Sequence, residues 1–152
     1  MPRLDEFEGD WSIERIVEDL FLGRHVEFTG IARLIPEKDG LLYREEGTLK
    51  VPGQVPIAAS RSYHWRAEGN MIAVYFADAR PFHRFDCDDP APQASHSCDP
   101  DLYQVSYEFH HWPDWRSTWR ALGPHKDYVL HNHFSRLSSN VAAQTQRTIT
   151  AG

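Results

Sequence analysis

The residues best suited to chemistry are a carboxylate and a guanidinium that alternate with aromatic side chains in two successive segments. Glu45 follows Tyr43 in the first segment, and Arg61 precedes Tyr63 in the second. Residues two apart in an extended chain point to the same side, so each charged group shares its side with a tyrosine. Because a charge inside a protein is costly unless it is paired, Glu45 and Arg61 are candidates for a buried ion pair.

Two interpretations of this pair are open. In the first, the two groups lie near an open end of the fold, solvated or bonded only to one another. In the second, they line a cavity whose aromatic walls hold an apolar ligand, and Arg61 binds its carboxylate or phosphate with a planar fork. The residues predicted to bind such a ligand are Tyr43, Glu45, Arg61, Tyr63, Trp65, His83, Tyr103, Tyr107, Trp119, Lys126 and Tyr128.

A metal site is the next candidate, because His83, His96 and Cys98 carry imidazole and thiol groups that bind zinc and similar ions. The spacing matches no zinc signature, and a His-x-Cys in an Asp-rich segment is more often a pair of polar surface residues. We therefore predict no metal and no other cofactor.

Catalysis is an open question, since no nucleophile signature, phosphate loop or dinucleotide fingerprint is present. A paired Glu45 and Arg61 with tyrosine hydroxyls and a histidine would still suffice for acid–base isomerase or lyase chemistry. The sequence does not decide whether the protein is an enzyme.

Length and charge narrow the class of protein. The chain of 152 residues suits one domain, and its net charge of −6 argues against binding to nucleic acid. No stretch approaches the roughly 20 apolar residues of a membrane span, and the acidic N-terminus does not resemble a signal peptide. A cytoplasmic protein without membrane contact is expected, in which Cys87 and Cys98 are free thiols; a disulfide between them is the alternative.

The elements that must position these residues begin with a predicted amphipathic helix over Asp10–Leu22. Its apolar residues recur at helical spacing, Asp10 can cap its first turn and Gly23 can end it. Two-fold alternation then predicts strands at His25–Leu34, Leu41–Val51, Ala58–Arg66, Met71–Phe76, Pro81–Asp86, Leu102–His111, Trp115–Leu122 and Asp127–Leu137.

Three segments need separate interpretation. Pro113–Leu122 can also be drawn as a short helix, although its two-fold face and its neighbours favour a strand. Asp88–Pro100, rich in Asp, Pro and Ser, is predicted to be a long loop, and residues 138–152 are predicted to be a flexible tail. Short connections favour antiparallel pairing, and closure removes exposed edges, so we predict a mainly β, antiparallel barrel of eight to nine strands with one N-terminal helix.

Two sets of motifs resemble known families. Gly9-Asp10-Trp11 resembles the Gly-x-Trp signature of lipocalin-like (calycin) barrels, and the resemblance implies that Trp11 packs beneath the barrel floor against Arg136. Most of the chain resembles a family of small proteins filed as a domain of unknown function, through the motifs Tyr43-x-Glu45-x-Gly47-x-Leu49, Arg61-x-Tyr63-x-Trp65, Phe82-His83, His96-x-Cys98-x-x-Asp101-x-Tyr103 and Gly123-Pro124-x-Lys126-Asp127-Tyr128. That resemblance implies a single calycin-like domain over residues 1–152 and no assigned activity.

Together these patterns predict a barrel that binds a small, partly apolar, anionic molecule. Acid–base catalysis in the same cavity is one alternative. A protein-interaction module with a solid barrel is the other, and assembly into a homo-oligomer is open.

Overall fold

The computed structural model describes residues 2–138, which form one antiparallel sheet of ten strands. A short 3-10 helix, η1 (Leu4–Phe7), precedes the strands. They are β1 (Gly9–Asp19), β2 (Arg24–Glu37), β3 (Gly40–Lys50), β4 (Ile57–Glu68), β5 (Met71–Phe76), β6 (Pro81–Asp86), β7 (Gln93–Cys98), β8 (Asp101–Glu108), β9 (Trp115–Gly123) and β10 (Lys126–Arg136).

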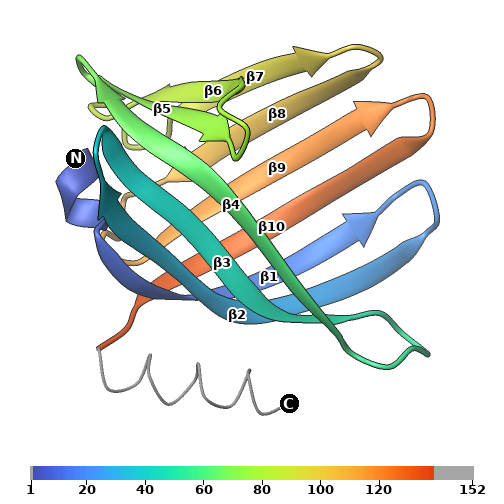
Figure 1. Cartoon of the computed structure of the whole chain (residues 1–152). Coiled ribbons are helices and arrows are strands. Elements are labelled where there is room, and N and C mark those ends of the chain that lie inside the picture. The colour runs from blue at the N-terminus through green and yellow to red at the C-terminus, as the bar shows by residue number, and fades with distance from the viewer. Residues whose placement is uncertain (1, 139–152) are drawn as a thin grey trace.

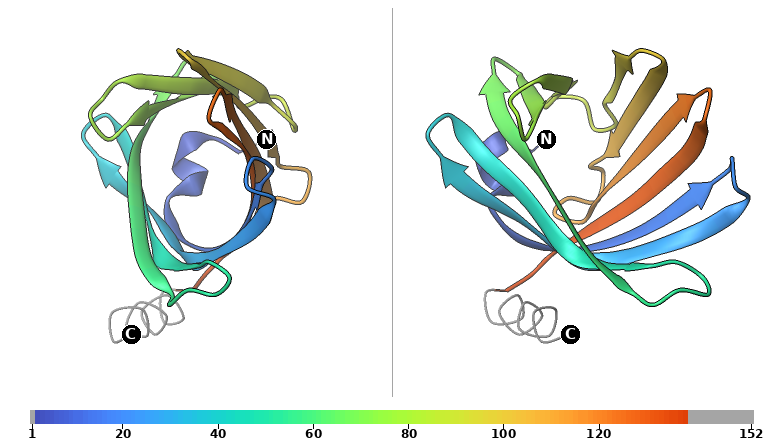
Figure 2. Two further views of the ribbon diagram at one scale, coloured as in Figure 1. Left: turned by 90° about the vertical axis from the view of Figure 1, so that its right-hand side faces the viewer. Right: turned by 45° about the vertical axis from the view of Figure 1, so that its right-hand side comes forward.

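The sheet curls into a nearly closed barrel (Figures 1 and 2). Its strand order is β6-β5-β4-β3-β2-β1-β10-β9-β8-β7, so the first and last strands are hydrogen-bonded neighbours and the two edges are β6 and β7. The edges meet through side chains, since the rings of Phe82 on β6 and His96 on β7 lie 5.5 Å apart. The predicted antiparallel barrel is confirmed.

The predicted N-terminal helix is wrong, because Asp10–Leu22 contains strand β1 and the turn after it. β1 pairs with β2 on one side and with β10 on the other. Every second residue from Trp11 to Arg15 is buried, whereas Ile16, which belongs to the predicted helical stripe, is half exposed. Pairing on both edges outweighs a local helical pattern, and the β-branched residues of this segment suit a strand.

The remaining elements follow the prediction with one exception. Each of the strands predicted after Gly23 is present, and Trp115–Gly123 is a strand rather than a helix. The predicted loop Asp88–Pro100 is wrong in part, because it contains β7, which raises the strand count to ten. No helix in residues 2–138 is long and apolar enough to cross a membrane. The predicted tail begins at Ser138, and residues 139–152 lie outside the described residues.

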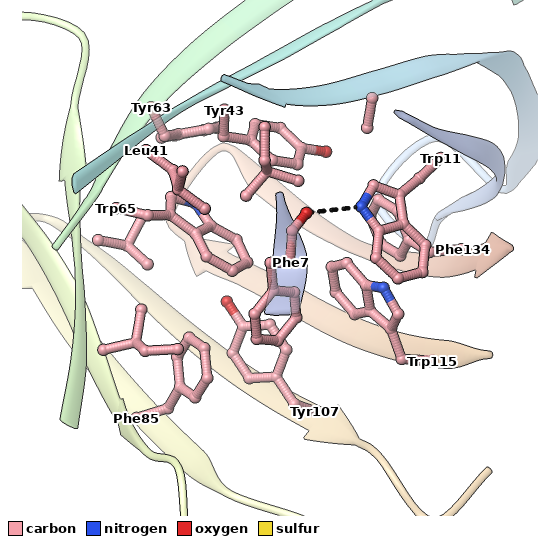
Figure 3. Close-up of a cluster of buried hydrophobic side chains, with 14 of the residues drawn as sticks. Phe7, Trp11, Leu41, Tyr43, Tyr63, Trp65, Phe85, Tyr107, Trp115 and Phe134 are labelled. Carbon is pink, nitrogen blue, oxygen red and sulfur yellow. Dashed lines mark hydrogen bonds between the residues drawn. The ribbon is translucent and has the colours of Figure 1, made fainter. Parts of the chain in front are cut away.

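The helix η1 lies at one end of the barrel (Figure 2), and aromatic side chains around it close that end (Figure 3). Phe7 is fully buried, and its ring lies 5.2 Å from that of Trp65 and 5.4 Å from that of Trp115. Trp11 donates a hydrogen bond from Nε1 to the carbonyl oxygen of Phe7 at 2.9 Å. This cluster fills the end of the barrel at which β1 begins.

Arg136, at the end of β10, fixes η1 to the barrel. Its guanidinium lies 4.0 Å above the Trp11 ring and donates hydrogen bonds to the carbonyl oxygens of Glu6 and Glu8, at 2.7 and 2.8 Å. Trp11 and Arg136 are thus in the contact that the Gly-x-Trp resemblance implies. At the opposite end, where the β1–β2, β3–β4 and β9–β10 turns lie, no helix of residues 2–138 covers the barrel (Figure 2).

Candidate functional site

The open end of the barrel holds a pocket of about 430 Å³. Its walls are mostly apolar and aromatic, and its polar groups are few. The lining residues are Val17, Asp19, Arg24, Val26, Leu49, Val51, Arg61, Tyr63, Phe76, Phe82, Tyr103, Trp119, Ala121, Tyr128 and Leu130. They come from strands β1 to β6 and β8 to β10, so the inward alternation of nearly the whole sheet forms this space.

Arg61 is one of three charged residues that line this pocket, with Asp19 and Arg24. It lies opposite Glu45 in the β3–β4 ladder, and its Nε is 3.3 Å from Glu45 Oε2. The Arg61 side chain is 39% exposed, whereas that of Glu45 is 2% exposed. Arg61 Nη1 donates a long bond of 3.4 Å to the Tyr63 hydroxyl, and no further hydrogen bond of Arg61 is formed with residues 2–138. The N–H groups of Nη2 and the second N–H of Nη1 therefore have no partner among these residues, and Arg61 lines the pocket.

Glu45 is held mainly by Arg15, a residue that the sequence analysis missed. Arg15 Nη1 and Nη2 donate to the two carboxylate oxygens at 2.7 and 2.9 Å, and the Tyr43 hydroxyl donates to Oε1 at 2.7 Å. Arg15 Nε donates to Asn132 Oδ1, and Asn132 Nδ2 donates to Ser117 Oγ at 3.0 Å. A chain of buried polar groups thus crosses the barrel from β9 to β4 below the pocket.

This chain of groups carries an excess of positive charge. Two guanidinium groups, Arg15 and Arg61, face one carboxylate, Glu45, which leaves one net positive charge beside the pocket. Burial by itself raises the pKa of the Glu45 carboxyl, but the hydrogen bonds and charge of Arg15 and the charge of Arg61 outweigh it and lower that pKa. Glu45 is accordingly ionised at neutral pH. At the rim, the charges of Asp19 and Arg24 cancel, because Arg24 Nε lies 3.9 Å from Asp19 Oδ2.

The aromatic wall opposite Arg61 is built from contacts between rings. Tyr63 stacks on Phe82 with centroids 6.0 Å apart, and Trp119 lies edge-on to both at 5.8 and 5.2 Å. Phe76 stacks on Phe82 at 4.5 Å. Burial raises the pKa of Tyr63 despite the nearby charge of Arg61, so its hydroxyl is neutral at physiological pH. The wall offers flat apolar faces that suit a partly apolar molecule.

The predicted ligand-binding residues fall at several depths. Arg61, Tyr63, Tyr103, Trp119 and Tyr128 line the pocket. Glu45 and Tyr43 lie beneath it in the polar chain, and Trp65 belongs to the buried cluster of the closed end. Lys126 stands at the rim, where its Nζ is 2.9 Å from Asp101 Oδ2.

His83 and Tyr107 form a buried pair below the wall. His83 Nε2 and the Tyr107 hydroxyl are 2.7 Å apart, and neither side chain lines the pocket at the open end. Burial lowers the pKa of His83 to about 3, helped by the nearby His96, so the imidazole is neutral. Burial also raises the pKa of Tyr107. The pair acts as a polar contact within the core.

The three candidate metal ligands do not form a cluster. His83 is buried, Cys98 is exposed, and the His96 ring packs against Phe82 and Tyr103 at 5.5 and 6.2 Å. Among residues 2–138, no group of three His, Cys, Asp or Glu side chains could hold a metal ion. Cys87 and Cys98 are both free, as expected.

The signal for Arg15 was present in the sequence. Trp11, Ile13, Arg15 and Val17 alternate along β1, so their side chains share the inner face of the strand. The helical interpretation placed Arg15 on a solvated face instead. Asn132 and Ser117 carried no signal of their own, because short polar residues are common on either face of a strand.

Comparisons with known proteins agree with this fold. The model of a family described as "Family of unknown function (DUF6314)" matches residues 7–136. No curated protein matches the sequence. The match confirms the resemblance to a domain of unknown function.

Two solved structures share the barrel. A protein of unknown function from the DUF3598 family of Nostoc punctiforme superposes with a TM-score of 0.61 at 10% identity, over 90% of this chain and 50% of that one. An S-type phycobiliprotein lyase from Guillardia theta superposes with a TM-score of 0.56 at 11% identity, over 90% of this chain and 91% of that one. The present chain thus spans half the length of the Nostoc protein. Both likenesses are at the level of the lipocalin-like fold.

Proposed function

The chain belongs to the DUF6314 family, a family of unknown function, and from the geometry of its open end we propose that it binds a small, partly apolar, anionic molecule. In this proposal residues 1–152 form a single barrel domain. Arg61 binds the anionic group of the ligand, and the aromatic wall holds its apolar body. Lys126 and Tyr128 lie at the entrance.

The observation that carries the proposal is the unbalanced charge of Arg61. Its Nε lies beside Glu45 and one N–H of Nη1 donates to Tyr63, but its other outer N–H groups form no hydrogen bond with residues 2–138. Arg15 already binds both oxygens of the same carboxylate. A guanidinium in a partly desolvated pocket binds a carboxylate or phosphate through charge-assisted hydrogen bonds. An anionic ligand would neutralise the excess charge.

The size and walls of the pocket support a ligand of modest size. A space of about 430 Å³ is within the range of small-molecule sites, which are typically lined by apolar side chains with a few polar groups. Leu49, Phe76 and Leu130 supply apolar surface, and Arg61 is the polar group at the bottom. This composition favours an amphipathic ligand over a sugar or a nucleotide.

We favour binding over acid–base catalysis because Glu45, the candidate base, takes up a proton poorly. The Glu45 carboxylate accepts bonds on both oxygens and has a lowered pKa, so it is a weak proton acceptor. His83 has no access to the pocket. The Guillardia relative is a phycobiliprotein lyase, which keeps a lyase as the alternative, with the tyrosine hydroxyls of the pocket as the remaining proton donors.

The proposal is tested with two fluorescent probes that differ in charge. Anilinonaphthalene sulfonate is anionic, and N-phenylnaphthylamine has the same rings without the sulfonate. We expect Arg61→Met to lower the affinity for the sulfonate probe about tenfold or more, because a charge-assisted hydrogen bond is lost. The affinity for the neutral probe should not change. Arg44→Met is the matched control, because Arg44 lies on the next strand and is exposed beside Glu46 and Ser62. Equal affinity of both probes for native protein and Arg61→Met would contradict the proposal.

A further inference from the structure

A second, much smaller cavity lies directly beneath the pocket. Its volume is about 20 Å³, enough for one water-sized atom. Tyr63 and Trp119 line both spaces, so these two side chains form the boundary between the pocket and the cavity. The other lining residues are Arg15, Tyr43, Trp65, Val74, Tyr107, Trp115, Ser117, Asn132 and Phe134.

Two indole N–H groups from this lining have no partner. Nε1 of Trp115 and Nε1 of Trp119 are both buried and form no hydrogen bond with the described part of the chain. Trp115 itself is 1% exposed. By contrast, Nε1 of Trp11 donates to the Phe7 carbonyl at the closed end, and Figure 3 shows this bond beside the Trp115 indole. A buried donor without an acceptor costs free energy, so an acceptor atom that paired with either group would be favourable.

Two polar oxygen atoms of the cavity lining already accept hydrogen bonds. Asn132 Oδ1 accepts from Arg15, and Ser117 Oγ accepts from Asn132 Nδ2. The Glu45 carboxylate, behind Tyr43, accepts from Arg15 and Tyr43. The two indole N–H groups, which are donors, are therefore the groups of this lining that most need a partner. The net positive charge of Arg15, Arg61 and Glu45 adds to the preference for an electron-rich atom.

We propose that this cavity is a subsite for a carbonyl oxygen of the ligand. The inference rests on the proposed function, since the body of the ligand would lie in the pocket above. One oxygen would reach the cavity when the rings of Tyr63 and Trp119, which lie edge-on with centroids 5.8 Å apart, separate. The indole N–H groups of Trp115 and Trp119 donate to that oxygen. The subsite thus selects ligands with a neutral oxygen on the apolar body, separate from the anionic group at Arg61. Hydrocarbons of the same shape leave both donors unpaired and are disfavoured.

Two neutral probes of nearly equal shape test the subsite. Cyclohexanone carries a carbonyl oxygen where methylenecyclohexane carries a CH₂ group, and neither needs Arg61. In protein labelled with nitrogen-15 in the indoles, cyclohexanone is expected to move the N–H resonances of Trp115 and Trp119 downfield, and methylenecyclohexane is not. After correction for the partition of each probe between water and octanol, cyclohexanone is expected to bind about two- to tenfold more tightly, the worth of one neutral hydrogen bond. This corrected ratio is the preference for cyclohexanone.

Tryptophan variants identify the resonances and supply the controls. Trp119→Phe removes one donor and is expected to abolish the preference for cyclohexanone. Trp115→Phe removes the other donor and should have the same effect. If the Trp115→Phe variant does not fold, Trp119→Phe still tests the subsite. Trp112→Phe is the matched control, because Trp112 packs against Phe7 and Trp11 at the closed end. Equal resonance shifts and affinities for both probes, as a permanently bound water would give, would overturn the subsite.

The outcome is separable from that of the proposed function. Arg61→Met is expected to keep most of the preference for cyclohexanone, because the indole N–H groups of Trp115 and Trp119 are unchanged and only the smaller effect of the Arg61 charge is lost. If the sulfonate probe shows no dependence on Arg61 while cyclohexanone still moves the two indole resonances, the anion site fails and the carbonyl subsite stands. If Arg61 matters but the neutral probes are equivalent, the subsite alone fails.

Discussion

Arg15 on β1 and Glu45 on β3 form two parallel hydrogen bonds, of 2.7 and 2.9 Å, although β2 lies between their strands. The long Arg15 side chain bridges this distance inside the barrel, above Phe28 of β2, whose ring centre is 4.9 Å from its guanidinium carbon. The contact joins two strands that share no backbone hydrogen bonds. The contact therefore forms only when the sheet is curved enough to bring the inner faces of β1 and β3 together.

The first prediction concerns the charge at Glu45. Glu45→Gln leaves the guanidinium groups of Arg15 and Arg61 without a counter-ion, and we expect the free energy of unfolding to fall by about 3–5 kcal/mol, the cost of breaking a buried ion pair. Urea denaturation measures it. Glu46→Gln is the control, because Glu46 pairs with the exposed Arg44 and should change stability by less than about 1 kcal/mol. Similar effects of the two variants would contradict a buried role for Glu45.

The second prediction concerns pH. Burial lowers the pKa of His83 to about 3, whereas an unfolded histidine titrates near about 6.5. Between these values the unfolded chain binds one more proton than the folded one, so His83 stabilises the fold above about pH 6.5 and this contribution is lost as the pH falls. The slope approaches 1.4 kcal/mol per pH unit, about the value for one proton.

Replacing the imidazole separates this effect from other titrations. His83→Phe is expected to flatten the dependence of the unfolding free energy on pH between about 6.5 and 5, whatever its stability at neutral pH. His125→Gln changes an exposed histidine in the β9–β10 turn and should keep the native slope. Equal slopes in native protein and His83→Phe would show that the imidazole is not held neutral by the fold.

The third prediction concerns the plug at the closed end. Arg136→Met removes two hydrogen bonds to the carbonyl oxygens of Glu6 and Glu8 and the contact with Trp11, and we expect a loss of about 2 kcal/mol. Thermal denaturation measures the loss, and limited proteolysis should cleave first near η1. Arg136→Lys should recover only part of the stability, because an ammonium lacks the fork that spans two carbonyls. If Arg136→Lys recovered the full stability, the positive charge alone would explain the effect, and the two hydrogen bonds would not.

Period-two alternation was enough to predict the barrel and the neighbours Glu45 and Arg61. A short turn between antiparallel strands limits which residues can pair across them. In the β3–β4 pair, Glu45 lies directly opposite Arg61. Alternation also predicted which tyrosines face inward. These features depend on local pattern and chain reversal, which the residues themselves encode.

The errors arose where distant strands decide the structure. Ile16, Leu20 and Phe21 are exposed, yet their spacing matched a helical stripe, and only pairing with β2 and β10 makes Gly9–Asp19 a strand. β7 was missed because its polar residues, paired only with β8 in residues 2–138, need no apolar face. Arg15 was missed for the same reason as β1, since its inward direction follows from the strand.

The last prediction tests both the pocket and the register of β1. Val17 lines the pocket, whereas the adjacent Ile16 is on the outer face and half exposed. Val17→Trp places an indole in a space of about 430 Å³, so we expect affinity for both N-phenylnaphthylamine and the sulfonate probe to fall at least about tenfold, since the lost pocket volume removes apolar contact area. This pattern differs from that of Arg61→Met, which should affect the charged probe alone.

Ile16→Trp is its matched control, because the same substitution one residue away points to solvent. It should bind both probes like the native protein, and fluorescence titration with circular dichroism on both variants separates loss of binding from loss of fold. In the helix predicted over Asp10–Leu22, Ile16 and Val17 both belong to the apolar stripe, and the two variants would then behave alike. A selective effect at Val17 therefore supports a hollow barrel and the strand register together, whereas full binding by Val17→Trp would place the probes outside the barrel.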